Sequence, residues 1–266
     1  MTSNAALDFT SFELPVTRIA ESGPVTEEET LVRRDLAAAY RLCALFSWDD
    51  LIYTHISARV PGPEHHFLVN PLGLGFDEIT ASNLVKIDID GNVVGDSPHR
   101  PNAAGFVIHG AIHSTREDAG SVMHLHTEAG MALSALEEGL LPLTQHAMRF
   151  HGKVGYHDYE GIALTLDEQR RFVADLADNT ALVLRNHGTL TVGRSVAQAF
   201  TEMFYLEKAA GAQLRAQATG RPLRIPPTEV VELTARTWAT DLAGSNDREW
   251  PSLVRRLERT DPGFTQ

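Results

Sequence analysis

Apolar residues follow two different spacings along this chain, and these predict which segments form helices and which form strands. From Thr26 to about Phe46 they recur every three to four positions, as in an amphipathic helix, and Thr26 with Glu29 is typical of a capping box. Positions 52–60 and 67–69 alternate as strands do. The Pro- and Gly-containing segment between them predicts a hairpin.

The rest of the chain alternates between the same two types of element. A second hairpin is expected over 86–94, because Asp90-Gly91-Asn92 is a turn signal. Strands are expected over 121–126, 181–184 and 189–192, and helices over 80–84, 105–115, 127–136, 167–177 and 195–218. The stretch 152–161 is rich in Gly, Tyr and His and is expected to be a loop beside a site. This order of elements predicts a layered α/β fold.

The chain divides into an N-terminal arm of residues 1–25, one α/β domain of residues 26–220 and a helical extension of residues 221–266 packed on that domain. The extension follows a Gly- and Pro-containing linker and carries two amphipathic helices. Several large apolar side chains of the helix over 195–218 and of the extension either form a partner surface or pack inside one subunit. They are Phe200, Met203, Phe204, Leu206, Trp238 and Trp250.

Composition narrows the functional classes. The chain has 43% hydrophobic and 22% charged residues, as an ordinary globular protein does. Its net charge of −12 and the lack of a Lys/Arg-rich stretch argue against a nucleic-acid partner. No apolar run reaches the ~18 residues of a membrane span, and the N-terminus does not resemble a secretory signal. The single cysteine, Cys43, excludes an internal disulfide, so we expect a cytoplasmic protein.

Two histidines in one predicted strand are the leading candidates for chemistry. Side chains two positions apart in a strand lie on the same face, so His124 and His126 should project side by side, about 7 Å apart along the strand. His187 is a third candidate, because it follows a buried-looking strand and precedes Gly188, where the backbone turns. Three histidines can hold a metal ion and leave a position open for a ligand. The alternative is three unrelated histidines.

Other motifs do not offer a competing chemistry. The chain lacks a Walker A loop, Gly-x-Gly-x-x-Gly, Gly-x-Ser-x-Gly and His-Glu-x-x-His, which weakens readings as a nucleotide-binding enzyme or a serine hydrolase. His109 and His113 are spaced to share one face of a helix, and we expect them to pack or to support the metal ligands.

Several motifs together resemble one family. The runs 104–109, 124–126 and 184–188 occur in the order and approximate spacing of the class II aldolase/adducin family, and the stretches 54–59 and 158–161 fit it too. The resemblance covers roughly residues 30–220. It implies a three-layer α/β/α fold around a mainly antiparallel sheet, usually assembled as a homotetramer. It also implies a divalent metal, zinc in the sugar-phosphate aldolases, on the residues matching His124, His126 and His187.

The chain departs from the family aldolases around the substrate. Those enzymes carry a Ser-Ser-Glu run whose Glu acts as acid and base, four residues before the histidine matching His109; here Gly105 takes the place of that Glu. Their phosphate-binding Thr-Gly and Gly-Asn pairs appear as Leu72-Gly73 and Thr54-His55. A phosphate needs several charge-assisted donors, so we expect a substrate without phosphate. Adducin head domains also lack the Glu, which keeps loss of activity open.

These features predict a metal-dependent lyase that cleaves a carbon–carbon bond, by aldol cleavage or decarboxylation, in a small oxo- or hydroxy-acid. The metal is expected to be zinc, with iron, manganese or cobalt as alternatives. Three other functions stay open: an Fe(II)-dependent oxygenase or decarboxylase, a metal-dependent dehydratase or epimerase, and a non-catalytic adducin-like interaction module.

Further site residues follow from the resemblance. His146 lies near the position of a family tyrosine that reaches a neighbouring subunit's site, so it is the candidate acid/base; otherwise it is a surface histidine before a strand. His55 is expected either to bind a carboxylate or to cap its strand. Gly73, Gly105 and Tyr159 are the other candidates for substrate contact.

Overall fold

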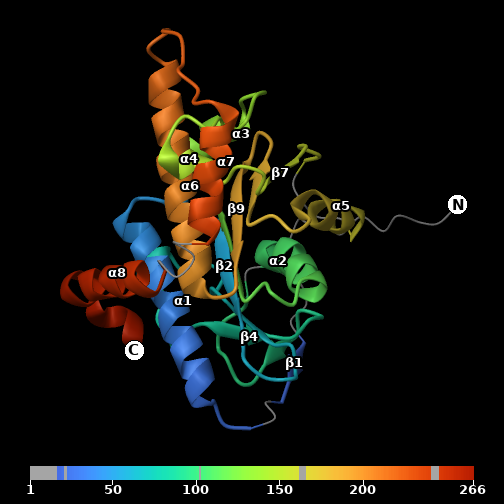
Figure 1. The fold of residues 1–266 in the computed structure, drawn as a ribbon. Helices are drawn as coiled ribbons and strands as arrows, with labels where there is room; N and C mark the ends of the chain where they lie inside the picture. The colour runs from blue at the N-terminus through green and yellow to red at the C-terminus, as the bar shows by residue number, and fades with distance from the viewer. Residues whose placement is uncertain (1–16, 21–22, 102, 162–165, 241–245) are drawn as a thin grey trace, which may run out of the picture.

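One sheet forms the middle layer of the molecule. The computed structural model describes residues 17–20, 23–101, 103–161, 166–240 and 246–266. Within these residues nine strands form a single sheet, and helices cover both of its faces (Figure 1). The predicted three-layer α/β/α arrangement is therefore confirmed.

The elements alternate along the chain much as the apolar pattern predicts. The strands are β1 (Arg18–Ile19), β2 (His55–Arg59), β3 (Phe67–Val69), β4 (Val85–Ile87), β5 (Val93–Val94), β6 (Ser121–Leu125), β7 (Val154–His157), β8 (Ala181–Leu184) and β9 (Gly188–Gly193). The helices are α1 (Glu27–Leu45), α2 (Ala103–Thr115), α3 (Glu128–Ser134), α4 (Gln145–Met148), α5 (Leu166–Leu176), α6 (Val196–Gln217), α7 (Thr228–Ala239) and α8 (Asn246–Thr260). Two short 3₁₀ helices are η1 (Phe76–Glu78) and η2 (Pro262–Thr265).

The strand order is β1-β5-β4-β3-β2-β6-β9-β8-β7. The edge strands β1 and β7 pair in parallel with their neighbours, and the other neighbouring strands pair antiparallel. The sheet is thus mixed, with a mainly antiparallel interior as expected. In the centre, His55 of β2 lies opposite His124 of β6, which lies opposite Leu190 of β9. Residues opposite each other share a face, so two of the candidate histidines lie side by side.

Each face of the sheet has its own apolar core. On one face, α1, α6 and α8 pack over the sheet, and their shared core includes Leu36 of α1, Phe200 of α6 and Met123 of β6. On the other, which we call the α2/α5 face, Ile112 of α2 and Phe172 of α5 pack over β6, β8 and β9. Burying one such large side chain contributes about 1.5–3 kcal/mol.

The large apolar residues of the C-terminal region mostly pack inside the chain. Phe200, Met203, Leu206 and Trp250 are buried, and only Phe204 and Trp238 are half-buried. The packing alternative therefore holds for the first four, and those side chains do not form a partner surface.

One predicted loop is wrong. Residues 152–161 include β7, which extends the sheet beyond β8. Gly155, which favoured a loop, lies under α5 so closely that an added Cβ would come within 2.1 Å of the Asp175 carbonyl oxygen. This glycine marks a close approach of a helix to an edge strand, not a turn.

The helix predicted over 80–84 is also wrong. Thr80 and Asn83 hydrogen-bond reciprocally, as capping residues do, but the chain enters β4 at Val85 before a helix can follow. The cap predicted at Thr26 is confirmed, since its side-chain oxygen accepts a hydrogen bond from the backbone N–H of Glu29. Ser195 caps α6 in the same way, with the backbone N–H of Gln198 as the donor.

Two further features bear on the predicted boundaries. Arg18–Ile19, within the predicted arm, pair with β5 and so belong to the sheet. Among the residues described, no helix combines the length and apolar character needed to cross a membrane.

Candidate metal centre

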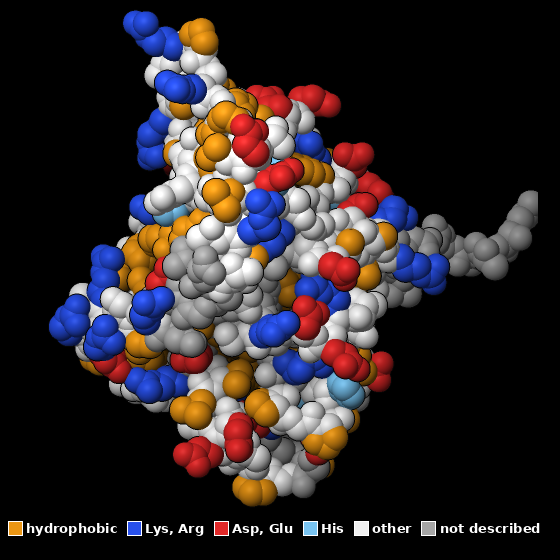
Figure 2. All heavy atoms as spheres, viewed as in Figure 1, with side chains coloured by type: hydrophobic (Ala, Val, Ile, Leu, Met, Phe, Trp, Pro, Cys, Tyr) orange, Lys and Arg blue, Asp and Glu red, His pale blue; other side chains and the backbone are white. Residues whose placement is uncertain are grey.

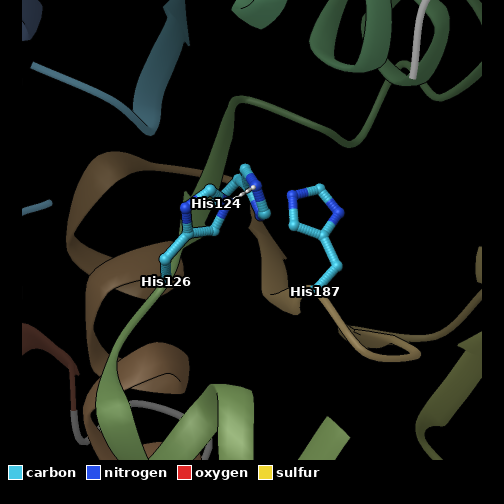
Figure 3. Close-up of side chains that lie close together, drawn as sticks. All are labelled: His124, His126 and His187. Carbon is cyan, nitrogen blue, oxygen red and sulfur yellow. Dashed lines mark hydrogen bonds between the residues drawn. The ribbon is translucent and has the colours of Figure 1, made fainter. Parts of the chain in front are cut away.

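Three histidines from two neighbouring parts of the sheet meet at one of its ends. His124 lies in β6, His126 follows that strand directly, and His187 lies in the turn between β8 and β9. Their rings face one another, with centroids 4.7–4.8 Å apart (Figure 3). One ligand nitrogen from each lies within 4.8 Å of the others. The structure thus brings together the three residues predicted as metal ligands.

The turn that carries His187 depends on its neighbours in sequence. Asn186 has a φ of +56°, which Asn tolerates better than most residues. At Gly188 an added Cβ would lie 2.5 Å from the Leu125 carbonyl oxygen. A side chain there would push the β8–β9 turn away from β6, so the glycine permits the close approach that joins His187 to the other two histidines.

Hydrogen bonds orient two of the three rings. Nδ1 of His124 lies 3.1 Å from the Thr189 carbonyl oxygen, and Nδ1 of His126 lies 3.0 Å from Oδ2 of Asp50. Each Nδ1 therefore carries a proton, and each Nε2 is left as a ligand atom. These Nε2 atoms are 3.0 Å apart. Two nitrogen ligands of tetrahedral zinc are separated by roughly 3.3 Å, so a small adjustment fits them to one ion.

Electrostatics favour the form of histidine that binds metal. Burial, followed by the neighbouring imidazoles, lowers the pKa of His187 to about 4 and holds that of His124 well below its usual value. Neutral imidazole is the metal-binding form. His124 is buried, whereas His126 and His187 are half-buried, so the cluster is open on one side. This donor set fits a divalent ion with room for another ligand.

Two of the predicted substrate residues lie close to this cluster. The buried ring of His55 lies 5.2 Å from that of His124, on the α2/α5 face. Tyr159 is exposed, with its ring 6.5 Å from that of His187. The structure thus places both residues beside the three-histidine cluster.

The remaining candidates are less closely tied to the cluster. Gly73, with a φ of +91°, lies in a turn next to the bridge between Pro71 and Pro101. Gly105 lies in the first turn of α2, where the surrounding side chains fall outside the described residues. No contact among the described residues joins either glycine to the three histidines.

His146 belongs to α4 rather than preceding a strand, and it packs against α6. Its ring lies 4.9 Å from that of Tyr205, and burial, Arg149 and Lys208 lower its pKa. Within the described part of this chain, no contact connects it with the three-histidine cluster. Any role there would have to be played in another subunit's site.

Asp50 contacts the candidate metal centre but is not among the site residues predicted from the sequence. It is separated from His126 by 76 residues. Its only signal is an acidic pair, Asp49-Asp50, after the first helix. No spacing rule connects that pair to a histidine in β6, and only the fold does.

Comparisons with known proteins show which family the chain belongs to. Residues 34–214 match the Class II Aldolase and Adducin N-terminal domain. An aldolase II superfamily protein from Pseudomonas syringae, 50% identical, superposes with a TM-score of 0.88 over 91% of this chain and 98% of that one. L-fuculose 1-phosphate aldolase from Glaciozyma antarctica PI12, 28% identical, gives 0.81 over 96% of this chain and 97% of that one.

A different kind of relative is also similar. Alpha-adducin of Rattus norvegicus is 44% identical over 194 residues, which are 72% of this chain but only 26% of that much longer protein. The match to the domain covers most of the chain, and both kinds of relative share it. The protein belongs to the class II aldolase and adducin N-terminal domain family.

Proposed function

We propose that this protein is a divalent-metal-dependent lyase that cleaves a carbon–carbon bond next to a carbonyl in a small, non-phosphorylated oxo- or hydroxy-acid. The convergence of His124, His126 and His187 carries this proposal, because Asp50 and Thr189 aim two of their Nε2 atoms at one point. A divalent ion there, zinc by preference, supplies a Lewis acid that polarises a carbonyl.

The substrate class follows from what surrounds the cluster. The L-fuculose 1-phosphate aldolase similar to this chain is named for a phosphorylated sugar. Here Gly105 and Leu72 take the places expected of an acid and a hydroxyl donor, and His55 is buried. A phosphate needs charge-assisted donors, whereas a carboxylate or hydroxyl next to a carbonyl needs fewer. A small unphosphorylated acid therefore fits better.

The competing proposal is an interaction module without catalysis, and the 44% identity with rat alpha-adducin favours it. The two proposals differ in what they require of the cluster. A lyase needs a bound metal and an accessible open position, whereas an interaction module needs only the fold.

A metal assay followed by a substrate screen separates them. We expect the purified chain to hold one divalent ion. The zinc-, manganese-, cobalt- and iron-loaded forms are then tested on oxo- and hydroxy-acids and on sugar phosphates. Product analysis by NMR should show carbon–carbon cleavage of an unphosphorylated acid, with His187→Ala as the inactive control. Oxygen consumption by the iron-loaded form would instead support an oxygenase. A dehydrated or epimerised product would support a dehydratase or epimerase. A metal-free, inactive protein would favour the interaction module.

We also propose a homotetramer in which His146 acts in a neighbouring subunit's site. Exposed apolar side chains support an assembly: Leu51 and Tyr53, next to Asp50, are 76% and 53% exposed. Apolar side chains also gather where α6 meets α8 (Figure 2), at a pocket of about 350 Å³ lined in part by Phe204 and Leu253. Such patches commonly mark partner surfaces.

Mixing two inactive variants tests the shared site. His146→Ala chains and His126→Ala chains should each be inactive alone. After subunit exchange, about a quarter of the sites would receive both intact histidines by random assortment, so activity should return to that extent. A monomer by light scattering, or no recovery although the chains exchange, would contradict the shared site.

A further inference from the structure

A buried chain of hydrogen bonds runs from a backbone carbonyl to the edge of the histidine cluster. His113 Nδ1 lies 2.9 Å from the Ala119 carbonyl oxygen, and His113 Nε2 lies 2.7 Å from Ser57 Oγ. Ser57 Oγ lies 2.7 Å from His109 Nδ1, and His109 Nε2 lies 2.9 Å from His55 Nδ1. We call this series the His113–His55 chain. As their spacing predicted, His109 and His113 share one face of α2.

The side chains of this series are shielded from water. Each of the four residues is at most 4% exposed. Burial first, and nearby charged or imidazole groups second, lower the pKa of His55 and His113 to about 3, and that of His109 well below its usual value. Among the described residues, the hydrogen-bond partners of these three rings are a carbonyl oxygen, a hydroxyl and one another, without a carboxylate. A buried imidazole without a counter-ion is neutral, so each ring carries one N–H.

The carbonyl at one end fixes the direction of every hydrogen bond. A carbonyl only accepts, so Nδ1–H of His113 donates to Ala119 and its Nε2 must accept from Ser57. The hydroxyl has a single hydrogen, so Ser57 accepts from Nδ1–H of His109. It follows that Nε2 of His109 accepts from Nδ1–H of His55.

The result is a fixed tautomer of His55 beside the candidate metal centre. The single N–H proton of the His55 ring is on Nδ1, so Nε2 presents a lone pair. The ring packs against His124, and the electrostatic influence of His126 and His187 on it indicates that both are also nearby. His55 is not among the nitrogens that cluster within 4.8 Å in the described part of the chain, so it is not a fourth ligand of that group.

We propose that Nε2 of His55 accepts a hydrogen bond from a hydroxyl of the substrate, and thereby selects a hydroxyl over a carboxylate or phosphate oxygen at that position. Carboxylate and phosphate oxygens are acceptors, and two facing acceptors leave each other without a partner. This replaces the carboxylate considered from the sequence with a hydroxyl. This inference about the substrate rests on the proposed function. It narrows the substrate class to compounds with a hydroxyl near the reacting carbonyl.

Neutron diffraction of the zinc-loaded protein at neutral pD shows the direction of each hydrogen bond in the His113–His55 chain, without an assay of activity. We expect deuterium on Nδ1 of His55, His109 and His113, and none on Nε2 of His55. Deuterium on Nε2 of His55 would overturn the proposal whatever the enzyme does. If the deuterons lie as expected but no substrate is cleaved, the lyase proposal fails and the tautomer stands.

Ligand preference tests the consequence for recognition. The probes are glycolate, which offers a hydroxyl beside a carboxylate, and oxalate, which offers a second carboxylate instead. The Ser57→Ala substitution removes the hydroxyl that links His113 to His109 in the His113–His55 chain. His55 can then take the Nε2–H form and donate a hydrogen bond to a carboxylate. Calorimetry on zinc-loaded protein should show the preference for glycolate over oxalate falling about tenfold.

Ser121→Ala is the matched control. Ser121 is also buried, in the neighbouring strand, and its hydroxyl donates to the Ser57 carbonyl oxygen rather than to an imidazole. Its loss should leave the ratio of the two affinities unchanged. An equal change in both variants, or none in Ser57→Ala, would count against selection by His55. Should Ser57→Ala fail to fold, the neutron result alone decides the tautomer.

Discussion

Replacing His124 and His126 together by alanine should reduce bound divalent metal from one ion per chain to background. Two of the three nitrogen ligands are lost, and His187 alone cannot hold an ion against dialysis. Activity on the substrate found by screening should fall by about a hundredfold to a thousandfold, the size of effect expected when electrostatic stabilisation is removed. Elemental analysis after dialysis, with circular dichroism to check the fold, makes the measurement. Equal metal content in variant and parent would refute the centre.

A milder change tests how the ligands are oriented. Asp50→Asn keeps the shape of the side chain but replaces the carboxylate that accepts from Nδ1 of His126. Changing such a partner typically lowers metal affinity by about 10–100-fold. Asp49→Asn is the matched control, because it removes the same charge one residue away. If competition with a chelator gives both variants the same affinity for the metal ion, the hydrogen bond between Asp50 and His126 does not contribute to metal binding.

Two of the three candidate ligands could be predicted from local geometry, whereas His187 reaches them only because β9 pairs with β6. His124 and His126 share a face through the period of a strand, and Gly188 marks the turn that carries His187. The order of the strands in the sheet does not follow from such patterns. That order places β2 beside β6, and so places His55 beside His124.

The hydrogen bonds that orient the site lie beyond sequence patterns for the same reason. Asp50 reaches His126 across 76 residues, and Ser57 reaches His109 and His113 across more than 50. Each pairing depends on strand register and on the rotation of α2 above the sheet. The spacing of His109 and His113 indicated a shared face, but not that a serine of β2 lies between them.

Acidification should destabilise the metal-free protein strongly, and His113 should contribute a separable part of the effect. Its pKa falls to about 3 in the folded chain, because of burial and the nearby guanidinium of Arg59, against about 6.5 when exposed. The unfolded chain thus binds more protons between these values. The stabilising contribution is complete above pH 6.5 and is lost as the pH falls towards 3. At pH 5 the loss is about 2 kcal/mol for this one group.

Urea unfolding in the presence of a chelator, followed by tryptophan fluorescence from pH 7.5 to pH 4.5, measures this loss. In His113→Asn the folded chain no longer holds that neutral imidazole, so the free energy of unfolding should fall less steeply with pH, by up to about 1.4 kcal/mol per unit. The other buried histidines titrate in both proteins and cancel in the comparison. His151→Asn, which removes an exposed histidine, is the control variant. Parallel curves for wild type and His113→Asn would mean that the pKa of His113 is the same in the folded and unfolded chains, so that below about pH 6.5 His113 would be protonated in the folded chain. The His113–His55 chain would then have no fixed direction, because a charged His113 donates from both nitrogens and leaves the Ser57 hydroxyl free to point towards His109.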